Sequence, residues 1–160
     1  MKAAPSAAGA PVFEIRDVVY RYEGVTALDG LTLTVARGQR VAILGANGSG
    51  KSTLLRLLDA LRFPASGSIS FCGEPLTEER FGEDAFAFDF RRRVGFVFQN
   101  PDVQLFNPTV FDEVAFAPLQ LRWPRGEIRR RVAETLDVMR ISHLKDRSPH
   151  RLSGGEKKRV

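Results

Sequence analysis

The sequence predicts an α/β fold with an antiparallel β-subdomain near its N-terminus and an α-helical subdomain in its second half. The apolar run Val41–Leu44 is followed by a glycine-rich stretch and then by leucines at helical spacing from Leu54 to Leu61, which is the order strand, loop, helix. Patterns typical of strands dominate up to residue 108, and helical patterns follow. The length of 160 residues suits one domain, or a core with a small subdomain.

The first part of the chain carries most of the predicted strands. Phe13–Tyr22 is rich in β-branched and aromatic residues, and Leu31–Val35 alternates apolar residues with threonines. Ile69–Cys72 reads as a shorter strand. Val41–Leu44 and Val94–Phe98 are apolar almost throughout, which predicts strands buried on both faces.

The predicted helices begin at recognisable signals. One begins near Lys51 and stops before Pro64. Thr109, followed three residues later by Asp112, resembles a helix N-terminal box, and we expect Pro118 to end that helix. The acidic and aromatic stretch from residue 77 to residue 90 has no clear period, so no element is predicted there.

A basic helix is predicted in the last quarter of the chain. After Gly126, apolar residues recur at helical spacing: Ile128, Val132, Leu136 and Met139. Its opposite face carries Arg129–Arg131. The net charge of +5 is concentrated after residue 120, where 12 basic side chains outnumber 5 acidic ones. Such a face is either solvated or binds an anionic partner.

These patterns predict a division of the chain into four parts. Residues 1–11 form a flexible tail, and residues 12–99 form the core with the antiparallel β-subdomain. Residues 100–153 form the helical subdomain, and residues 154–160 begin a helix that returns to the core. Cys72 is the single cysteine, so no internal disulfide is possible and a reducing cytosol is the natural environment.

The most specific motif is a phosphate-binding loop, and it predicts a P-loop NTPase core. It satisfies the full pattern G-x-x-x-x-G-K-[ST] where a predicted strand meets a predicted helix. Its glycines let backbone N–H groups converge on phosphate oxygens at a helix N-terminus. Lys51 is expected to reach the β- and γ-phosphates, and the Ser52 hydroxyl to ligate Mg²⁺. The loop consists of Gly45, Ala46, Asn47, Gly48, Ser49, Gly50, Lys51, Ser52 and Thr53.

A second motif lies near residue 153. Leu152–Glu156 reads L-S-G-G-E, in which Ser153 is expected to be the N-cap of a helix and Glu156 to reach back to its backbone N–H. Gly154 and Gly155 are poor helix residues, so a plain cap would rarely use both. They leave the amides at the positive helix end bare, which suits an anion.

With both motifs in place, the chain resembles the ATP-binding subunits of ABC transporters. That family has a phosphate loop, a glutamine loop, a helical subdomain and an L-S-G-G-[QE] signature, and all four occur here in that order. The resemblance implies ATP and Mg²⁺ as cofactors. It implies that Lys51 and Gln99 are catalytic, with Gln99 touching Mg²⁺ and the attacking water. It also implies an aromatic residue stacked on adenine, either Tyr22 or its neighbour Tyr20.

The same resemblance implies partners. In the family, two ATPase subunits sandwich nucleotide head to tail, so that Ser153, Gly154 and Gly155 would act in trans in a homo- or heterodimer. An integral membrane transport subunit is the other expected partner, with the chain peripheral on the cytoplasmic face of the cell membrane, and no nucleic acid is expected. The chain looks most like the ATPases of energy-coupling-factor and cobalt or nickel importers, at four segments: Phe98–Phe106, Pro108–Val110, Glu113–Phe116 and Glu156–Val160.

The chain also departs from the family pattern after the signature. The family next supplies an apolar strand with an aspartate and a glutamate, and then a switch histidine, whereas this sequence stops at Val160. We therefore expect an incomplete core sheet and no hydrolysis by these 160 residues alone. His143 and His150 precede the signature, and Glu134 and Asp137 lie on a polar helix face, so none of them substitutes for the missing groups.

Two other functions are compatible with these motifs. One is a soluble ABC ATPase that acts on nucleic acid or ribosomes, which the basic C-terminal quarter allows. The other is a binding-only module, because the 160 residues can hold phosphate without the carboxylates for hydrolysis. Association with an integral membrane protein favours an importer, and salt-sensitive retention of DNA or RNA favours the nucleic-acid function.

Overall fold

The computed structural model describes residues 11–100 and 104–160. The predicted N-terminal tail, apart from Pro11, lies outside the described residues. The chain divides into two compact units, Met1–Gly95 and Phe96–Val160.

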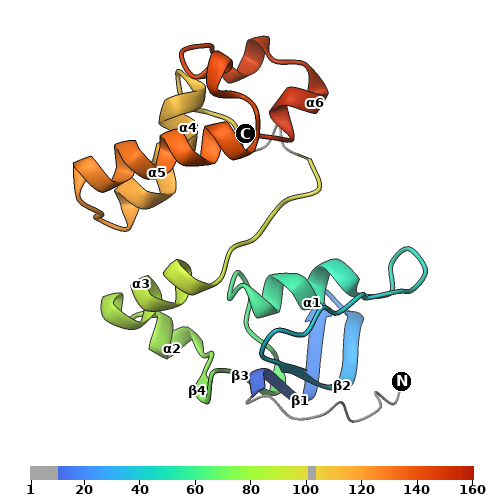
Figure 1. Cartoon of the computed structure of the whole chain (residues 1–160). Helices are drawn as coiled ribbons and strands as arrows, with labels where there is room; N and C mark the ends of the chain where they lie inside the picture. The colour runs from blue at the N-terminus through green and yellow to red at the C-terminus, as the bar shows by residue number, and fades with distance from the viewer. Residues whose placement is uncertain (1–10, 101–103) are drawn as a thin grey trace. The chain divides into compact units, whose positions relative to one another are not determined.

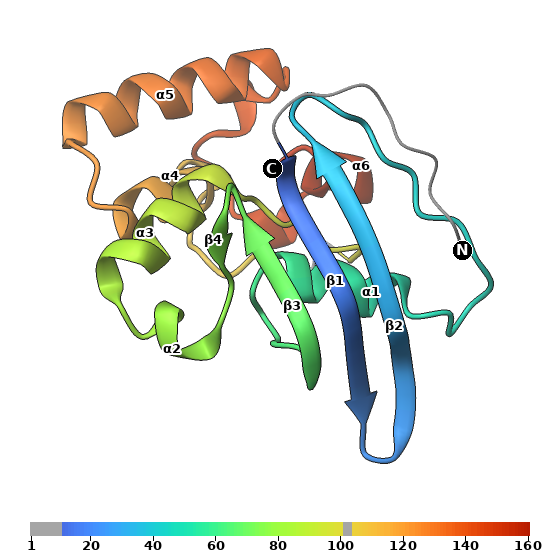
Figure 2. The ribbon, with the colours of Figure 1, turned by 90° about the horizontal axis from the view of Figure 1, so that it is seen from below.

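The first unit is built on an antiparallel sheet. Strands β1 (Pro11–Tyr22) and β2 (Val25–Ala36) form a hairpin, and β3 (Ser66–Phe71) pairs with the other edge of β1. The short β4 (Glu74–Pro75) completes the order β2-β1-β3-β4, which Figure 2 shows side by side. The strands predicted at Phe13–Tyr22, Leu31–Val35 and Ile69–Cys72 are confirmed.

Helices cover this sheet and share its core. Helix α1 (Lys51–Leu58) begins where the sequence predicts, and Leu54 and Leu57 are buried with residues of β1 and β3. Two further helices, α2 (Glu78–Phe81) and α3 (Asp84–Arg93), occupy the stretch for which no element was predicted.

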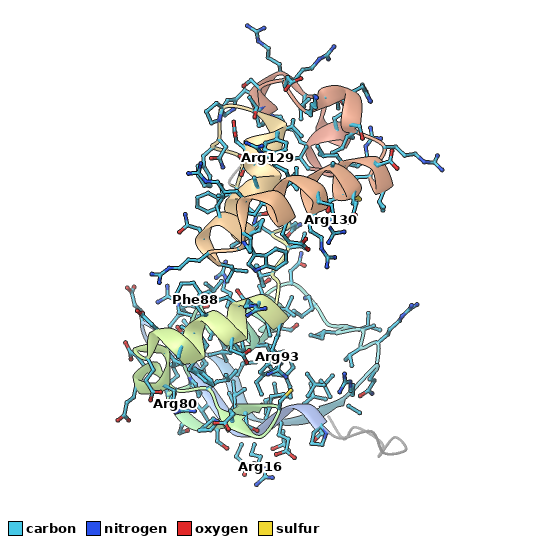
Figure 3. The ribbon with its side chains drawn as sticks, turned by 60° about the vertical axis from the view of Figure 1, so that its left-hand side comes forward. Arg16, Arg80, Phe88, Arg93, Arg129 and Arg130 are labelled. Atoms are coloured by element: carbon cyan, nitrogen blue, oxygen red, sulfur yellow. The ribbon has the colours of Figure 1, made fainter. Side chains whose placement is uncertain are left out.

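Aromatic contacts explain why α2 and α3 form. The Phe81 ring meets the rings of Phe86 and Phe90 edge to face, with centroids 5.3 and 5.0 Å apart. The guanidinium of Arg80 lies 4.8 Å from the centroid of the Phe86 ring. The guanidinium of Arg93 lies over the ring of Phe71, the last residue of β3; Figure 3 labels both arginines. Phe86 and Phe90 stand four residues apart, so this spacing was the available helical signal.

The two strands predicted to be buried on both faces are wrong. Neither Val41–Leu44 nor Val94–Phe98 forms a strand, and Figure 1 draws the segment between β2 and α1 as a plain loop. Leu44 is 82% exposed and Val97 is 91% exposed. A strand needs neighbours to accept and donate its ladder hydrogen bonds, and no described residue pairs with either segment.

The second unit is helical. It contains α4 (Val110–Gln120), α5 (Arg125–Val138), the short 3₁₀ turns η2 (Ser142–Leu144) and η3 (Pro149–Arg151), and α6 (Gly154–Lys157). One apolar cluster joins α4, α5, η2 and Leu152, and it includes the buried stripe Ile128, Val132 and Leu136 of α5. The predicted α5 is confirmed, except that Met139 follows the helix and is half-exposed.

Pro118 does not end α4, so that prediction is wrong. Its ring removes only its own N–H donor, two residues before the helix ends. The last turn is then closed by the Leu121 N–H, which donates to the Ala117 carbonyl, and by the Trp123 N–H, which donates to the Pro118 carbonyl.

In the part of the chain that the structure describes, no helix is both long and apolar enough to cross a membrane.

Candidate nucleotide-binding site

The loop before α1 has a backbone that only glycine fits at its last position. Gly50 is the N-cap of α1 and has a φ of 84°, a left-handed conformation. A Cβ atom there would clash with the carbonyl oxygen of Ala27 on β2. Gly48 also has a positive φ, and a Cβ at Gly45 would lie 2.6 Å from Ser49 Oγ. The loop is therefore packed tightly against itself and against the hairpin.

Lys51 lies over this loop. Its Nζ atom donates hydrogen bonds to the carbonyl oxygens of Gly45, at 2.9 Å, and Ala46, at 2.6 Å, with Ser49 Oγ at 3.4 Å. The N–H of Ser49 donates to the Ala46 carbonyl at 3.2 Å and curls the loop. An anion placed above the loop would meet the ammonium group and the positive end of α1 together.

The residues present fit a triphosphate with its magnesium ion. Ser52, in the first turn of α1, is exposed. The described residues contain no cluster of three or more His, Cys, Asp or Glu side chains that could hold a metal alone. The Ser52 hydroxyl would supply one ligand to a magnesium ion that is held mainly by phosphate oxygens and water, which is how this ion commonly binds with nucleotides.

Tyr22 lies beside the same helix turn. Thr53, buried in α1, has its Oγ1 atom 3.4 Å from the Tyr22 hydroxyl, and this hydrogen bond, aided by Arg56, lowers the pKa of Tyr22. Tyr20 packs against the core of the unit instead, with its ring centroid 4.9 Å from that of Tyr22. Of the two tyrosines, Tyr22 is the one linked to the phosphate-loop helix.

The signature segment forms the predicted capping box. The Ser153 backbone N–H and hydroxyl both donate to Glu156 Oε2 at 2.7 Å, and the Glu156 N–H donates to Ser153 Oγ at 3.3 Å. These bonds favour the ionised carboxylate, so the pKa of Glu156 is lowered. A Cβ at Gly154 or Gly155 would meet nothing within 4 Å, and neither glycine has a positive φ. Nothing within the described chain requires glycine at these positions.

Gln99 belongs to the second unit. It is exposed and lines a hollow of about 860 Å³. The same hollow is lined by aromatic side chains, by the last residue of α6 and by the three residues after it, at Phe96, Phe98, Phe106, Phe116 and Lys157–Val160. Pro101, Asp102 and Val103 of the glutamine-loop segment lie outside the described residues. Gln99 and Lys51 thus belong to different units, and the structure groups Lys51 with Thr53 and Tyr22.

Sequence reasoning missed two polar residues of these sites. Arg56 approaches Tyr22 from α1, and it stands three residues after Thr53 on the same helix face, a spacing that could have indicated it. Glu113 binds the backbone of the preceding loop, at Phe106 and Asn107. No local pattern predicts that contact, because it depends on how the loop folds back.

The basic face of α5 is largely satisfied within the helix. Arg130, labelled with Arg129 in Figure 3, forms ion pairs of 2.6 Å with both Glu127 and Glu134. Arg131 pairs with Glu127 at 2.9 Å. The arginines and Glu134 are exposed, so these contacts contribute little to stability. They describe a solvated helix face better than a ready anion-binding patch.

The sequence of this chain is similar to those of known ATP-binding proteins. The family model for the ABC transporter matches residues 28–160. The chain is 63% identical to the nickel import ATP-binding protein NikO of Rhodobacter capsulatus, over 94% of this chain and 59% of that protein. It is 47% identical to the energy-coupling factor transporter ATP-binding protein EcfA of Methanothermobacter thermautotrophicus, over 93% of this chain and 47% of that protein.

A solved structure is similar as well. The CbiO1 protein of Clostridium perfringens, part of the ABC transporter complex CbiONQ, matches with a TM-score of 0.78 and 38% identity, over 94% of this chain and 59% of that one. The chain spans about half to three fifths of the length of these relatives. The family model covers most of the chain and includes both the Lys51 loop and the Ser153 cap. This chain belongs to the ABC transporter family.

Proposed function

We propose that this chain is the nucleotide-binding part of an ATP-binding subunit that powers an ABC importer. The observation that carries the proposal is the glycine loop curled beneath Lys51 Nζ at the start of α1. A loop of this kind offers a cation, backbone amides and a helix N-terminus to one phosphate chain. The names of the relatives, which include nickel import and energy-coupling factor proteins, support the importer function.

Each part of the site has a proposed role in holding Mg-ATP. The loop Gly45–Thr53 cradles the phosphates, with Lys51 at the β- and γ-phosphates and Ser52 on Mg²⁺. Tyr22 stacks on adenine, which is supported by its link to Thr53. Gln99 orients the attacking water and contacts Mg²⁺. An amide cannot accept a proton near neutral pH, so Gln99 positions the water without deprotonating it.

A second ATPase subunit is proposed to complete the site. Ser153, Gly154 and Gly155 would contact the nucleotide held by the partner, in a homo- or heterodimer. The open space above both glycines supports this proposal, because no packing in the described chain accounts for their lack of side chains. Binding of ATP would close the pair, and hydrolysis would reopen it.

An integral membrane transport subunit is the other proposed partner. Phe106 is 62% exposed although it is aromatic, and it lines the same hollow as Gln99. Exposed apolar surface of this kind favours a protein contact. The subunit would be peripheral at the cytoplasmic face of the membrane. The relative named for nickel import supports a metal ion as the transported substrate, and the resemblance to energy-coupling-factor ATPases makes a vitamin the alternative.

The domain boundaries remain proposals of the same kind. We propose a core over residues 12–99, a helical subdomain over residues 100–153 and a returning helix over residues 154–160. The structure divides the chain by contacts after Gly95, which is four residues before the proposed core boundary. Residues 96–99, between these two boundaries, belong to no helix or strand.

The test is uptake of radioactive nickel or cobalt by cells that lack this gene. We expect the wild-type gene to restore uptake and the Lys51→Ala variant to fail, because the phosphates lose their cation. Lys145→Ala, which removes an exposed lysine outside both motifs, is the matched control and should restore uptake fully. Wild-type uptake in the Lys51→Ala strain would contradict the proposed use of ATP.

A nucleic-acid function is the second candidate, and the basic C-terminal quarter is the observation that favours it. The ion pairs of Arg130 and Arg131 with Glu127 and Glu134 weaken that support, since these arginines already have anionic partners. Binding of duplex DNA that falls steeply between 50 and 200 mM salt, on the scale of about a thousandfold, would favour this candidate.

A further inference from the structure

A carboxylate from α4 fixes the loop that precedes the helix. Glu113 Oε2 accepts hydrogen bonds from the backbone N–H groups of Phe106, at 3.0 Å, and Asn107, at 2.8 Å. Hydrogen bonds to an ionised acceptor are about twice as strong as those between neutral groups. One side chain therefore holds two successive amides of the loop.

The neighbouring carboxylate, Asp112, bonds to the N-cap residue of α4. Thr109 Oγ1 accepts a hydrogen bond from the Asp112 N–H at 3.1 Å and donates to Asp112 Oδ2 at 2.6 Å. The first two amides of the helix donate to the carbonyl oxygens of Lys145 and Arg147, both at 2.9 Å. The start of α4 is thus capped without Glu113, whose carboxylate is used on the loop.

The loop separates a buried side chain from an exposed one. Leu105 is 8% exposed, whereas the next residue, Phe106, is 62% exposed. The Phe106 ring lies edge to face against Phe116, with centroids 4.9 Å apart and planes at 86°. Phe116 follows Glu113 by three positions on α4, so both lie on the helix face that meets the loop. Glu113 and Phe116 hold the backbone and the ring of Phe106 from one helix.

We propose that Glu113 is a positioning residue, which holds the loop of residues 104–107 in the shape that presents Phe106 beside Phe116 to a partner. The choice of partner rests on the proposed function, which assigns Phe106 to the contact with the membrane transport subunit. Without the carboxylate, two amides lose their acceptor and the loop samples other shapes. Docking then requires the loop to be ordered again, which weakens binding.

The first test is hydrogen exchange at the two amides in the complete subunit. In Glu113→Ala we expect the Phe106 and Asn107 amides to exchange at least about tenfold faster, because both lose a charged acceptor. Glu113→Gln keeps a neutral oxygen and should show a smaller increase. Asp112→Ala, the matched control, should leave both amides at the wild-type rate. Wild-type exchange in Glu113→Ala would overturn the proposal.

The second test measures how tightly the complete subunit binds to inside-out vesicles. The vesicles are made from the cytoplasmic membrane of the cells that naturally produce the protein, and urea is used to strip them of peripheral proteins. We expect Glu113→Ala to bind about tenfold more weakly than wild type, Glu113→Gln to fall between them, and Asp112→Ala to bind as wild type. Phe106→Asp serves as the reference for the contact itself and should lose most of the binding.

The outcomes separate the two proposals. Wild-type docking by Phe106→Asp would show that this loop does not contact the membrane subunit, which would contradict that part of the proposed function. The hydrogen-exchange rates would still test whether Glu113 holds the loop. Loss of docking in Phe106→Asp, with full docking in Glu113→Ala, would overturn the positioning role. An equal loss in Asp112→Ala would also overturn it, because the effect would then come from the start of α4 in general.

Discussion

Tyr22 and Tyr20 stand two positions apart on β1, and their surroundings predict different consequences of truncation. Tyr22 is linked to Thr53 at the start of the phosphate-loop helix, whereas Tyr20 packs against the core. We expect Tyr22→Ala to weaken ATP binding by about 1–3 kcal/mol, the usual contribution of stacking on a base, and Tyr22→Phe to keep most of it. Fluorescent-nucleotide titration measures both variants.

Tyr20→Ala should instead reduce stability. Removing a half-buried ring from the core is expected to lower the free energy of unfolding by about 2 kcal/mol, with little change in the affinity for ATP of the folded protein. Urea unfolding measures this effect. If Tyr20→Ala weakened nucleotide binding more than Tyr22→Ala at equal stability, the assignment of the two tyrosines would have to be exchanged.

The capping box at α6 predicts a pH dependence. Bonds from Ser153 lower the pKa of Glu156, so its contribution to the cap is complete above the ordinary glutamate pKa and is lost as the pH falls through the lowered one. Carboxyl carbon NMR should show Glu156 titrating below the usual range. Ser153→Ala should raise that midpoint and leave Glu127, whose low pKa comes from Arg130 and Arg131, unchanged. An ordinary midpoint for Glu156 in the wild type would contradict the cap.

At the scale of elements, Gly50 joins α1 to the hairpin. Gly24 and Gly50 both have a positive φ. A Cβ atom at Gly24 would contact nothing within 4 Å, whereas a Cβ atom at Gly50 would clash with the Ala27 carbonyl oxygen. Gly24→Ala should cost about 1–2 kcal/mol of stability for the left-handed backbone alone. Gly50→Ala should cost about 1–3 kcal/mol more, because α1 must move off β2. Equal melting temperatures for the two variants would show that this approach is not tight.

Local patterns predicted the elements that local forces decide. The start of α1 at Lys51, the cap at Thr109 and the box at Ser153 were all confirmed, because each depends on residues within one helical turn. The strands predicted at Val41–Leu44 and Val94–Phe98 failed for the opposite reason. Their apolar composition is right for a core sheet, but a ladder depends on pairing with another segment, which a pattern within the strand cannot specify.

The candidate site likewise contains features that local sequence predicts and features that depend on tertiary packing. The position of the curled loop before α1 was predictable, because its geometry follows from glycines and a lysine at fixed spacing. The link between Tyr22 and Thr53 was not predictable, since it depends on how β1 packs beside α1. The contact of Glu113 with Phe106 and Asn107 escaped for the same reason, because it depends on a loop that folds back on its own helix.

For the whole molecule, binding and hydrolysis of ATP should separate. We expect residues 1–160 to bind Mg-ATP but not to turn it over, because the proposed site uses Gln99 to orient water and includes no carboxylate among the described residues to polarise it. Such groups each contribute about 10² to 10⁴ in rate. Phosphate release should be compared with that of a chain as long as the relatives. Comparable magnesium-dependent turnover by residues 1–160, lost in Lys51→Ala, would refute this prediction.

The most direct measurement is calorimetric titration of the protein with Mg-ATP, alongside Lys51→Ala and the control Lys145→Ala. The account predicts saturable binding by the wild type and by Lys145→Ala, and little or none by Lys51→Ala, although all three remain folded. At about 100 times Kd, bound nucleotide should add roughly 2.7 kcal/mol to the stability of the two binding proteins. Equal affinity in Lys51→Ala and the wild type would contradict the assignment of the loop Gly45–Thr53 as the nucleotide site.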